Sequence, residues 1–365
     1  MNSNRILVCN GGSSSLKLSV LGADDSLIAS HEVPAREADR SEAELVQELA
    51  KLGPAQVVGH RVVQGGSSFT EAVVIDARVL ARLTELVSLD RLHMPGALMG
   101  IRAAQTAFPE AVQVACFDTA FHAGMPEVAR TYALPAPWRE RWGLRRHGFH
   151  GLSHSYSWRT AARLLGSDDL RMVTCHLGSG SSLAAIRRGR SVDTTMGFTP
   201  LEGLPMATRA GSVDPGLLLW LEQEQGISPH ELADALETKS GMLGLAQTKD
   251  MREVVERAAN GDAAAALAQD VFVHHLAQGV ASMTASLGGL DALVFTGGIG
   301  ENSSAIRQLA VERLGFLGLK IDEELNLEPE DGARLEIRGG SAPILMVRAR
   351  EDLEVAAQAR RLLAS

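Results

Sequence analysis

Residues 6–21 read ILVCNGGSSSLKLSVL, and residues 172–186 read MVTCHLGSGSSLAAI. Each stretch consists of an apolar run, a turn of glycine and serine residues, and a second apolar run. This pattern is typical of a β-hairpin. One copy opens the chain and the other begins near its middle, so we interpret the pair as a duplication. The sequence therefore predicts two homologous halves, each of which begins with a hairpin whose tip is a Gly/Ser turn.

The rest of the chain predicts an α/β protein, because short apolar runs alternate with amphipathic helical stretches. Buried strands are predicted at residues 5–9, 56–63, 112–117, 170–175 and 292–296. Ser41 and Ser228 each stand three residues before a glutamate, which is the pattern of a capping box at the start of a helix. A long helix is predicted over residues 262–287 and a closing helix over residues 351–363.

Composition and charge exclude several classes of protein. The 365 residues include 35 Lys and Arg against 44 Asp and Glu, so the net charge is −9, which argues against a nucleic-acid partner. No apolar stretch approaches the roughly 20 residues that a membrane-spanning helix needs, and the first ten residues lack a secretory core. We therefore expect a soluble, cytoplasmic protein with no membrane partner. Each of the three cysteines lies in an apolar run, which predicts buried thiols without disulfides; they are Cys9, Cys116 and Cys175.

Three glycine-rich segments could hold phosphate, because glycine lets the backbone approach a ligand and N–H and hydroxyl groups donate to anionic oxygens. They are residues 10–17, 176–180 and 296–302. None has the spacing of a P-loop, and neither of the first two is followed directly by a helix. The third segment is predicted as a loop between a strand and a helix over residues 303–314, a junction that directs N–H groups at a ligand.

Charged residues form a second set of candidates. Arg61 lies within an apolar strand and must either meet an acid or face a site, since a buried unpaired charge is unfavourable. Arg209 lies in a loop without periodicity, and Asp118 ends an apolar strand, where the sites of α/β sheets tend to lie. The spacing of His147 and His154 around His150 suggests a metal, but zinc sites use additional Cys or carboxylate ligands that are not arranged nearby. We favour His150 as a donor to developing charge over a metal hydrolase.

Taken together, the motifs resemble the acetate kinase family, within the superfamily of actin, sugar kinases and Hsp70-type ATPases. The matching segments follow the family's order nearly from end to end: NGGSSSLK, GHRVVQGG, RLHMPG, FDTAFH, GFHGLSH, HLGSG, DTTMGFTPLEG, ATRAGSVDPG, GIGEN and REDLEVA. The resemblance implies two duplicated actin-like (ribonuclease H-like) domains around a central cleft, one of residues 1–120 and 353–365 and the other of residues 121–352. It also implies a homodimeric phosphotransferase that uses the carboxyl group of acetate as acceptor, ATP/ADP as co-substrate, and Mg²⁺ or alternatively Mn²⁺.

The resemblance assigns roles to individual residues. The residues that resemble the family's catalytic set are Arg61, Asp118, His150 and Arg209. Those that match the acetate pocket are Arg61, Val63, Leu92, Phe149 and Pro200. The metal-site residues are Asn10 and Glu351. Those that match the nucleotide-binding segments are Lys17, His176, Leu177, Gly178, Ser179, Gly180, Asp250, Met251, Arg252, Gly298, Ile299, Gly300, Glu301 and Asn302.

This chain departs from the family pattern at three places. Residues 18–58 form a shorter stretch than the family norm, Gln64 stands where histidine is usual, and Ser179 stands where asparagine is usual. The Ser179 change removes an amide and leaves a shorter hydroxyl, so it affects the expected affinity more than the expected reaction.

These residue types suit phosphoryl transfer to a carboxylate. A carboxylic acid titrates near pH 4, so its oxygen is already an anionic nucleophile at pH 7 and needs no general base. The obstacle is repulsion between two anions, which arginines, a metal ion and N–H donors can offset. We therefore expect direct in-line transfer, with Asp118 as an organiser of the metal and its waters.

Other interpretations stay open. Propionate or butyrate could replace acetate as the acceptor, although Val63 favours the smaller acid. A non-catalytic, actin-like ATP-binding protein would bind nucleotide without transferring phosphate, and it would leave Arg61 and Arg209 without a role. Pyrophosphate could replace ATP as the donor, but the intact segment at residues 298–300 indicates room for adenosine.

Overall fold

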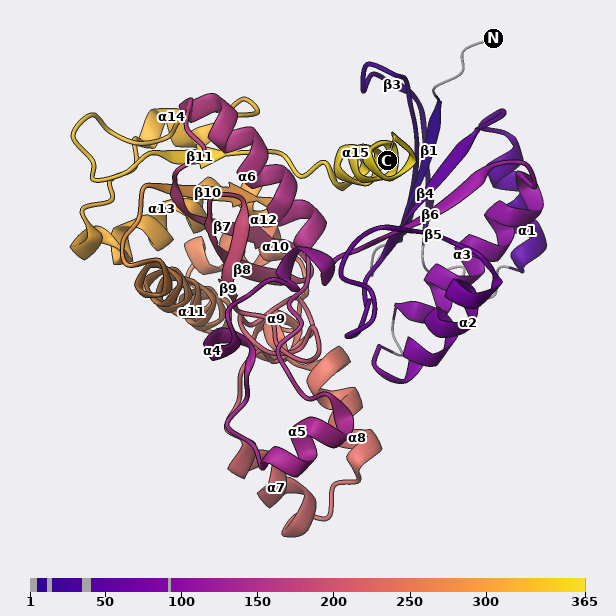
Figure 1. The fold of residues 1–365 in the computed structure, drawn as a ribbon. Coiled ribbons are helices and arrows are strands. Elements are labelled where there is room, and N and C mark those ends of the chain that lie inside the picture. Colours follow the sequence, from indigo (N-terminus) through magenta and orange to yellow (C-terminus); the bar gives the residue numbers. More distant parts are fainter. Residues whose placement is uncertain (1–4, 12–14, 35–40, 91–92, 365) are drawn as a thin grey trace. The chain divides into compact units, whose positions relative to one another are not determined.

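The computed structural model describes residues 5–11, 15–34, 41–90 and 93–364, and it contains two compact units, each with its own β-sheet (Figure 1). The chain enters the first unit three times and the second unit twice. Unit 1 comprises residues 1–123, 149–156 and 350–365, and unit 2 comprises residues 124–148 and 157–349.

The sheet of unit 1 has the strand order β3-β2-β1-β4-β6-β5. Its strands are β1 (Ile6–Gly11), β2 (Ser15–Leu21), β3 (Leu27–Pro34), β4 (Val57–Val62), β5 (Val73–Val74) and β6 (Val112–Phe117). Its helices are α1 (Glu42–Ala50), α2 (Ala77–Glu85), α3 (Met94–Ala107) and α15 (Glu351–Ala364), with 3₁₀ turns η1 (Leu86–Ser88) and η2 (Ala120–His122). Strands β1, β2 and β3 are antiparallel neighbours, whereas β1, β4 and β6 run parallel.

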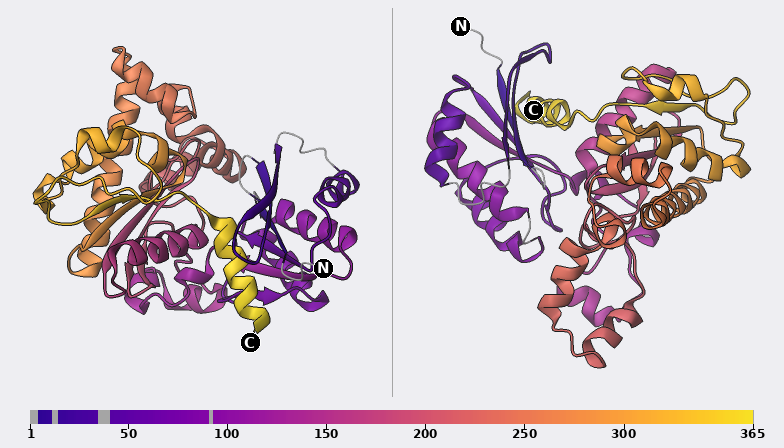
Figure 2. Two further views of the ribbon diagram at one scale, coloured as in Figure 1. Left: turned by 90° about the horizontal axis from the view of Figure 1, so that it is seen from above. Right: turned by 180° about the vertical axis from the view of Figure 1, so that it is seen from behind.

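Helices cover both faces of this sheet. Leu7 and Cys9 of β1 pack with α1 and α3, whereas Ile6 and Val8 pack with α15, because successive side chains of a strand point to opposite faces. In all three views α15, in yellow, lies against the indigo strands of the sheet (Figures 1 and 2). The α15 face therefore depends on a segment that lies at the far end of the chain.

Glycine in β4 allows this close packing of α15. A Cβ atom on Gly59 would lie 2.5 Å from Cγ1 of Val355, which is closer than real carbon contacts. The strand therefore needs a residue without a side chain at the point where α15 crosses it.

The sheet of unit 2 has the strand order β11-β10-β7-β8-β9. Its strands are β7 (Arg171–Leu177), β8 (Ser181–Arg187), β9 (Arg190–Thr194), β10 (Ala292–Thr296) and β11 (Ile344–Met346). The helices of this unit are α4 (Glu127–Arg130), α5 (Ala136–Trp142), α7 (Pro215–Gln223), α8 (Pro229–Asp234), α9 (Gly241–Ala246), α10 (Met251–Ala259), α11 (Ala263–Leu287), α12 (Gly297–Asn302), α13 (Ser304–Arg313) and α14 (Glu323–Leu327). A π-helical turn η3 (Ala235–Lys239) and a 3₁₀ turn η4 (Gly315–Leu317) complete it, and α6 (Gly151–Leu165) begins in unit 1 and ends in unit 2.

The two sheets share one topology, which confirms the predicted duplication. In unit 2, β7, β8 and β9 are antiparallel neighbours, and β7, β10 and β11 run parallel. The order β9-β8-β7-β10-β11 thus repeats the order β3-β2-β1-β4-β6 of unit 1. Both predicted hairpins are present, as β1 with β2 and β7 with β8.

The predicted long helix is α11, which supplies much of the core of unit 2. The side chain of Asp262 accepts hydrogen bonds from the N–H groups of Ala264 and Ala265 and caps the helix. Phe272 and Leu276 pack with Val173 and other residues of the sheet. Ser41 forms the predicted capping box of α1 with Glu44, and Ser228 caps α8, whose first residue is proline.

One predicted loop is a helix. Residues 297–302 form the short helix α12, and α13 follows it at Ser304, so the glycine-rich segment itself turns helical directly after β10. Thr296 is extended and Gly297 takes a φ of 77°, which turns the chain into the helix at once.

The three cysteines are free and buried, as predicted. Burial raises the pKa of the Cys9 thiol to about 12 and also raises the pKa values of the Cys116 and Cys175 thiols. They are therefore core residues rather than nucleophiles at neutral pH. Among the described residues, no helix has the length and apolar character needed to cross a bilayer.

Candidate active site

The predicted site residues fall into one group in each unit. The group in unit 1 contains Asn10, Lys17, Arg61, Val63, Asp118, Phe149, His150 and Glu351, and that in unit 2 contains residues 176–180, 250–252 and 298–302 with Pro200 and Arg209. Leu92 and residues 12–14 of the first glycine segment lie outside the described residues.

Strand geometry brings together the polar residues of unit 1. Val8 of β1 is aligned with Gly59 of β4, so Asn10 and Arg61, two positions further along, point to the same face. In β6, Cys116 is aligned with Arg61, and Asp118 follows two residues later. The three polar side chains therefore meet at the carboxyl ends of three parallel strands, on the face that α15 covers.

Arg61 and Asp118 form a close ion pair. Nη2 of Arg61 lies 2.7 Å from Oδ2 of Asp118, and Nε lies within 3.2 Å of both carboxylate oxygens. The Asp118 side chain is 1% exposed and that of Arg61 is 11% exposed. Burial alone would lower the pKa of Arg61, but the carboxylates of Asp118 and Glu351 raise it above its usual value. Of the two interpretations of Arg61, the structure thus shows that it meets an acid.

The other side of the guanidinium contacts Asn10. Nη1 of Arg61 donates to Oδ1 of Asn10 at 3.1 Å. An arginine has five N–H donors, and the contacts with Asn10 and Asp118 within the described residues leave one N–H on each Nη atom. Arg61 therefore keeps a fork of two donors, which is the geometry that binds a carboxylate or phosphoryl group.

Two further predicted residues lie on this side of unit 1. Glu351 is the first residue of α15, and its carboxylate acts on Arg61 electrostatically. Lys17 is exposed and pairs with Asn10 across the hairpin, so both side chains point to one face.

The segment after residue 148 packs against Asp118 through its backbone. The N–H of Gly151 donates to the carbonyl of Asp118 at 3.1 Å, and a Cβ on Gly151 would lie 2.0 Å from that oxygen. His150, directly before it, has a φ of 55°, which is rare for a residue with a side chain. Phe149 is buried and its carbonyl accepts from Nε2 of His122 at 3.0 Å. The structure thus fixes the backbone around His150 beside Asp118.

Oxygen donors for a cation are present in this group, namely the amide of Asn10 and the carboxylate of Glu351. Both oxygens of Asp118 already accept hydrogen bonds from Arg61. Within the described part of the chain, no three His, Cys, Asp or Glu side chains are grouped as a metal site. In particular, His147 is buried with a pKa lowered to about 4 by burial and by Arg145.

In unit 2 the structure brings two of the predicted nucleotide-binding segments together. The N–H of Gly178 donates to the carbonyl of Gly180 at 3.0 Å, which closes the tip of the β7–β8 hairpin. A Cβ on Gly178 would lie 3.9 Å from the backbone nitrogen of Gly298, and one on Gly297 would lie 2.7 Å from the carbonyl oxygen of Leu177. The hairpin tip and the start of α12 are therefore in direct contact, and at residue 297 only glycine fits.

The loop that carries Arg209 lies beside the same hairpin tip. The N–H of Ala207 donates to the carbonyl of Ser179 at 3.2 Å. Arg209 is 7% exposed, and its Nη1 donates to the carbonyl of Pro200 at 3.1 Å. The predicted residues Ser179, Pro200 and Arg209 are thus connected within unit 2.

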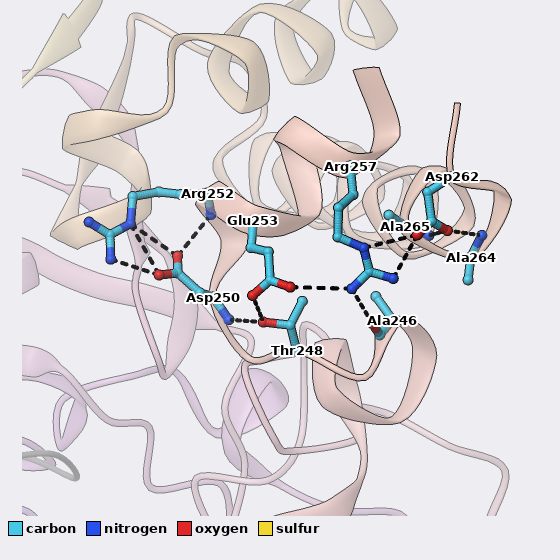
Figure 3. A network of polar contacts seen from close by, with 9 residues as sticks. All are labelled: Ala246, Thr248, Asp250, Arg252, Glu253, Arg257, Asp262, Ala264 and Ala265. Atoms are coloured by element: carbon cyan, nitrogen blue, oxygen red, sulfur yellow. Dashed lines mark hydrogen bonds and ion pairs between the residues drawn. The ribbon is translucent and has the colours of Figure 1, made fainter. Parts of the chain in front are cut away.

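Asp250 and Arg252 form an exposed pair at the start of α10 (Figure 3). Asp250 caps the helix by accepting from the N–H of Arg252, and its carboxylate also accepts from the guanidinium at 2.7 Å. Met251 between them is buried in the core. Figure 3 also shows Arg257, which ties Glu253 to Asp262 and so connects α10 with the start of α11.

One residue of this region was missed from the sequence. Arg307 of α13 is fully buried, and its Nη1 donates to the carbonyls of Gly300 and Glu301 at 2.9 and 2.8 Å. Its Nε donates to Oδ1 of Asn326 at 2.7 Å, and burial lowers its pKa to about 10. Arg307 therefore holds the carboxyl end of α12. The arginine at residue 307 looks like any surface residue of an amphipathic helix, so only its contacts reveal the role.

Comparisons with known proteins identify relatives of this chain. A model of the acetokinase family matches residues 38–357. An acetate kinase of Deinococcus deserti is 49% identical over 87% of this chain and 82% of its own length. An acetate kinase of Carboxydothermus hydrogenoformans is 38% identical over 98% of this chain and 99% of its own length.

Two solved structures resemble the whole chain. A propionate kinase from Francisella tularensis superposes with a TM-score of 0.90 at 35% identity, over 98% of this chain and 99% of that chain. Acetate kinase of Porphyromonas gingivalis superposes with a TM-score of 0.89 at 31% identity, over 99% of this chain and 100% of that chain. Sequence, fold and family model agree: the chain belongs to the acetokinase family.

Proposed function

We propose that this chain is an acetate kinase, which transfers the terminal phosphoryl group of ATP reversibly to acetate and forms acetyl phosphate. The observation that carries the proposal is that Arg61 is held by Asp118 and keeps N–H donors for an anionic ligand. The relatives of this chain include named acetate kinases. Asp118 binds one edge of the Arg61 guanidinium, and one N–H on each Nη atom remains for an anionic ligand.

The chemistry requires charge neutralisation rather than a base. Acetate is ionised at pH 7, so its oxygen can attack phosphorus directly once repulsion is offset. Arg61 in unit 1 and Arg209 in unit 2 supply permanent positive charge, since a guanidinium stays protonated at any working pH. We assign Arg61 and Arg209 to the carboxylate and the transferring phosphoryl group, and His150 to the developing charge. Val63, Phe149 and Pro200 would surround the methyl group.

The residues of unit 1 fit a magnesium ion. Asn10 and Glu351 offer a neutral and a charged oxygen, and Mg²⁺ commonly uses one or two protein oxygens together with waters and phosphates. When bound, the ion would neutralise phosphate charge. Asp118 holds Arg61, and its carboxylate would accept hydrogen bonds from waters of the bound ion.

The nucleotide would bind to unit 2, where the hairpin tip at residues 176–180 contacts the start of α12. Two glycine-lined backbone segments in contact offer N–H groups to phosphate oxygens without side chains in the way. Lys17, Asp250 and Arg252 would contact the nucleotide from outside this pair of segments. Direct transfer without a phospho-enzyme is the simplest route for these groups.

Neutral replacement of the two arginines tests the proposal. R61A and R209A should each lower kcat at least about a hundredfold, as expected for loss of a donor that stabilises the transition state, while circular dichroism stays unchanged. R102A and R313A remove exposed arginines from the same two units and serve as controls. Turnover of R61A or R209A close to that of the controls would refute the assignment, and recovery of activity with added guanidinium would support it.

Propionate kinase is the second candidate, because the propionate kinase of Francisella tularensis is a close structural relative. A hydroxamate assay of acyl phosphate with acetate, propionate and butyrate, each with ATP and with pyrophosphate, ranks the acceptors and donors. We expect the highest kcat/KM with acetate and ATP, because Val63, which is assigned to the acetate pocket and is buried, would leave less room for a longer acid.

We further propose a homodimer in the cytoplasm, as the family resemblance implies. Light scattering of the purified chain at micromolar concentration tests the dimer. A mass of one chain would contradict it.

A further inference from the structure

The carbonyl that Arg209 binds belongs to a loop held by side chains from a distant part of unit 2. Pro200 lies between β9 and α7, and its carbonyl accepts from Nη1 of Arg209 at 3.1 Å. Two residues further on, Glu202 accepts from Tyr132 and from Arg146. These two residues come from the segment around α4 and α5, more than fifty positions earlier in the chain.

The contacts of Glu202 use both of its carboxylate oxygens. Oε2 accepts from the hydroxyl of Tyr132 at 2.5 Å, and Oε1 accepts from Nη2 of Arg146 at 2.7 Å. The Tyr132 oxygen in turn accepts from the N–H of Phe198 at 2.9 Å. Burial and the neighbouring Glu202 raise the pKa of Tyr132, so the hydroxyl remains a donor at every working pH.

Arg146 connects the same loop to the sheet. Its Nη1 donates to the carbonyls of Thr195 and Met196, each at 3.0 Å, just after β9. Its guanidinium carbon also lies 5.6 Å from the centre of the Tyr132 ring. Gly197 is required here, because a Cβ would lie 1.7 Å from Oε2 of Glu202. Tyr132 and Arg146 therefore contact the loop at residues 195, 196, 198 and 202.

Part of the loop borders a cavity that Arg146 also lines. Thr195, Gly203 and Leu204 line an open cavity of about 300 Å³, whose other wall includes His275 and Gln278 of α11. Backbone hydrogen bonds also hold the loop, for example from the N–H groups of His147 and Gly148 to the carbonyl of Gly197, and the side-chain contacts of Glu202 add to them around residues 198–202.

We propose that Tyr132, Arg146 and Glu202 are positioning residues, which hold the loop so that the Pro200 carbonyl fixes the direction of the Arg209 guanidinium. Pro200 is also assigned to the acetate pocket, so the same three residues would fix the position of that one pocket residue. The inference rests on the proposed function, through the role of Arg209 in phosphoryl transfer.

The substitutions Y132F and E202Q test this role. Y132F leaves Oε2 of Glu202 and the N–H of Phe198 without their Tyr132 partner, and E202Q places an amide N–H against one of two donors. We expect each variant to lower kcat/KM for acetate about tenfold and to leave KM for ATP within twofold. The ratio of kcat/KM for propionate to that for acetate should rise at least threefold, since Pro200, which is assigned to the acetate pocket, is then held less firmly. Y156F, at the only other tyrosine of the chain, is the matched control.

A second measurement distinguishes positioning from general destabilisation. If Tyr132 acts through Arg209, Y132F should lower kcat/KM for acetate by less than twofold in an R209K background. Acetate kinetics and acid selectivity of Y132F and E202Q equal to those of Y156F would overturn the inference, and so would an equal loss of activity in both backgrounds. Absence of acyl phosphate formation by the wild-type chain would instead overturn the proposed function.

Discussion

At the scale of single residues, Gly151 shows how backbone contacts define the site in unit 1. The substitution G151A would place a Cβ 2.0 Å from the carbonyl oxygen of Asp118, so the backbone of one of the two segments must move. We expect kcat to fall at least about tenfold and the free energy of unfolding to fall by about 1–3 kcal/mol, as for other overpacked sites. Steady-state kinetics and urea denaturation measure both.

Gly124 provides the control for this change. A Cβ there would meet nothing within 4 Å, so G124A should leave both quantities unchanged within error. Wild-type kinetics in G151A would show that the contact between Gly151 and Asp118 does not matter for the reaction.

The pairing of site residues was only partly predictable at this scale. The apolar surroundings of Arg61 predict that it meets an acid or faces a site, but the sequence does not indicate that Asp118, 57 positions away, is the partner. The positive φ of His150 is equally hidden, because nothing in its neighbours distinguishes it. Such contacts depend on how segments that are distant in the sequence are aligned in the fold. A local sequence pattern carries no information about that alignment.

At the scale of elements, α15 depends on the gap that Gly59 leaves in β4. The substitution G59A would place a Cβ 2.5 Å from Cγ1 of Val355 and push the helix away from the sheet. We expect the free energy of unfolding to fall by about 1–3 kcal/mol. The substitution V355A removes the clashing Cγ1 atom. In that background, G59A should lower the free energy of unfolding by clearly less. Equal costs in the two backgrounds, measured by urea denaturation, would contradict this explanation.

Arg307 is the corresponding test for α12. The substitution R307M leaves the carbonyls of Gly300 and Glu301 buried without their donor, and each unsatisfied group costs about 1–3 kcal/mol. We expect a lower thermal midpoint and a KM for ATP raised at least about fivefold, with KM for acetate nearly unchanged. R313M, on the same helix but at an exposed ion pair, is the matched control. A KM for ATP equal to that of R313M would exclude a role of Arg307 in holding α12.

Regular elements were the most predictable part of the fold. Caps and periodicity indicate α1, α11 and α15 within one or two residues, because their signals are local. The short helix α12 was missed since three glycines in six residues predict a turn, and its helical form depends on contact with the hairpin tip and on Arg307. Tertiary contacts overrode the local preference there.

At the scale of the whole molecule, buried neutral histidines make stability depend on pH. Burial lowers the pKa of His60 from 6.5 to about 4, against the effect of its hydrogen bond with Gln113. Between these two values the unfolded chain binds a proton that the folded chain does not. The stability from neutral His60 is therefore complete above pH 6.5 and is lost as the pH falls toward 4.

This loss can be measured. From the 1.5 pH units between 6.5 and 5, we expect His60 to account for about 2 kcal/mol of stability lost at pH 5. Urea denaturation at pH 7 and pH 5 should show a smaller decrease for H60Q than for the wild type, whereas H230Q, at an exposed position, should behave as wild type. Equal decreases in all three proteins would show that His60 is protonated in the folded state.

The packing of α15 also has a consequence for biosynthesis. Ile6, Val8, Val114 and Cys116 of the first sheet pack with Val355 and Ala359, which follow unit 2 in the sequence and are therefore synthesised after it. One apolar face of the N-terminal sheet therefore stays uncovered during synthesis while unit 2 is translated. A polypeptide that ends before α15 would expose the apolar face of its first strands, and chaperones that bind apolar surface would be expected to bind there.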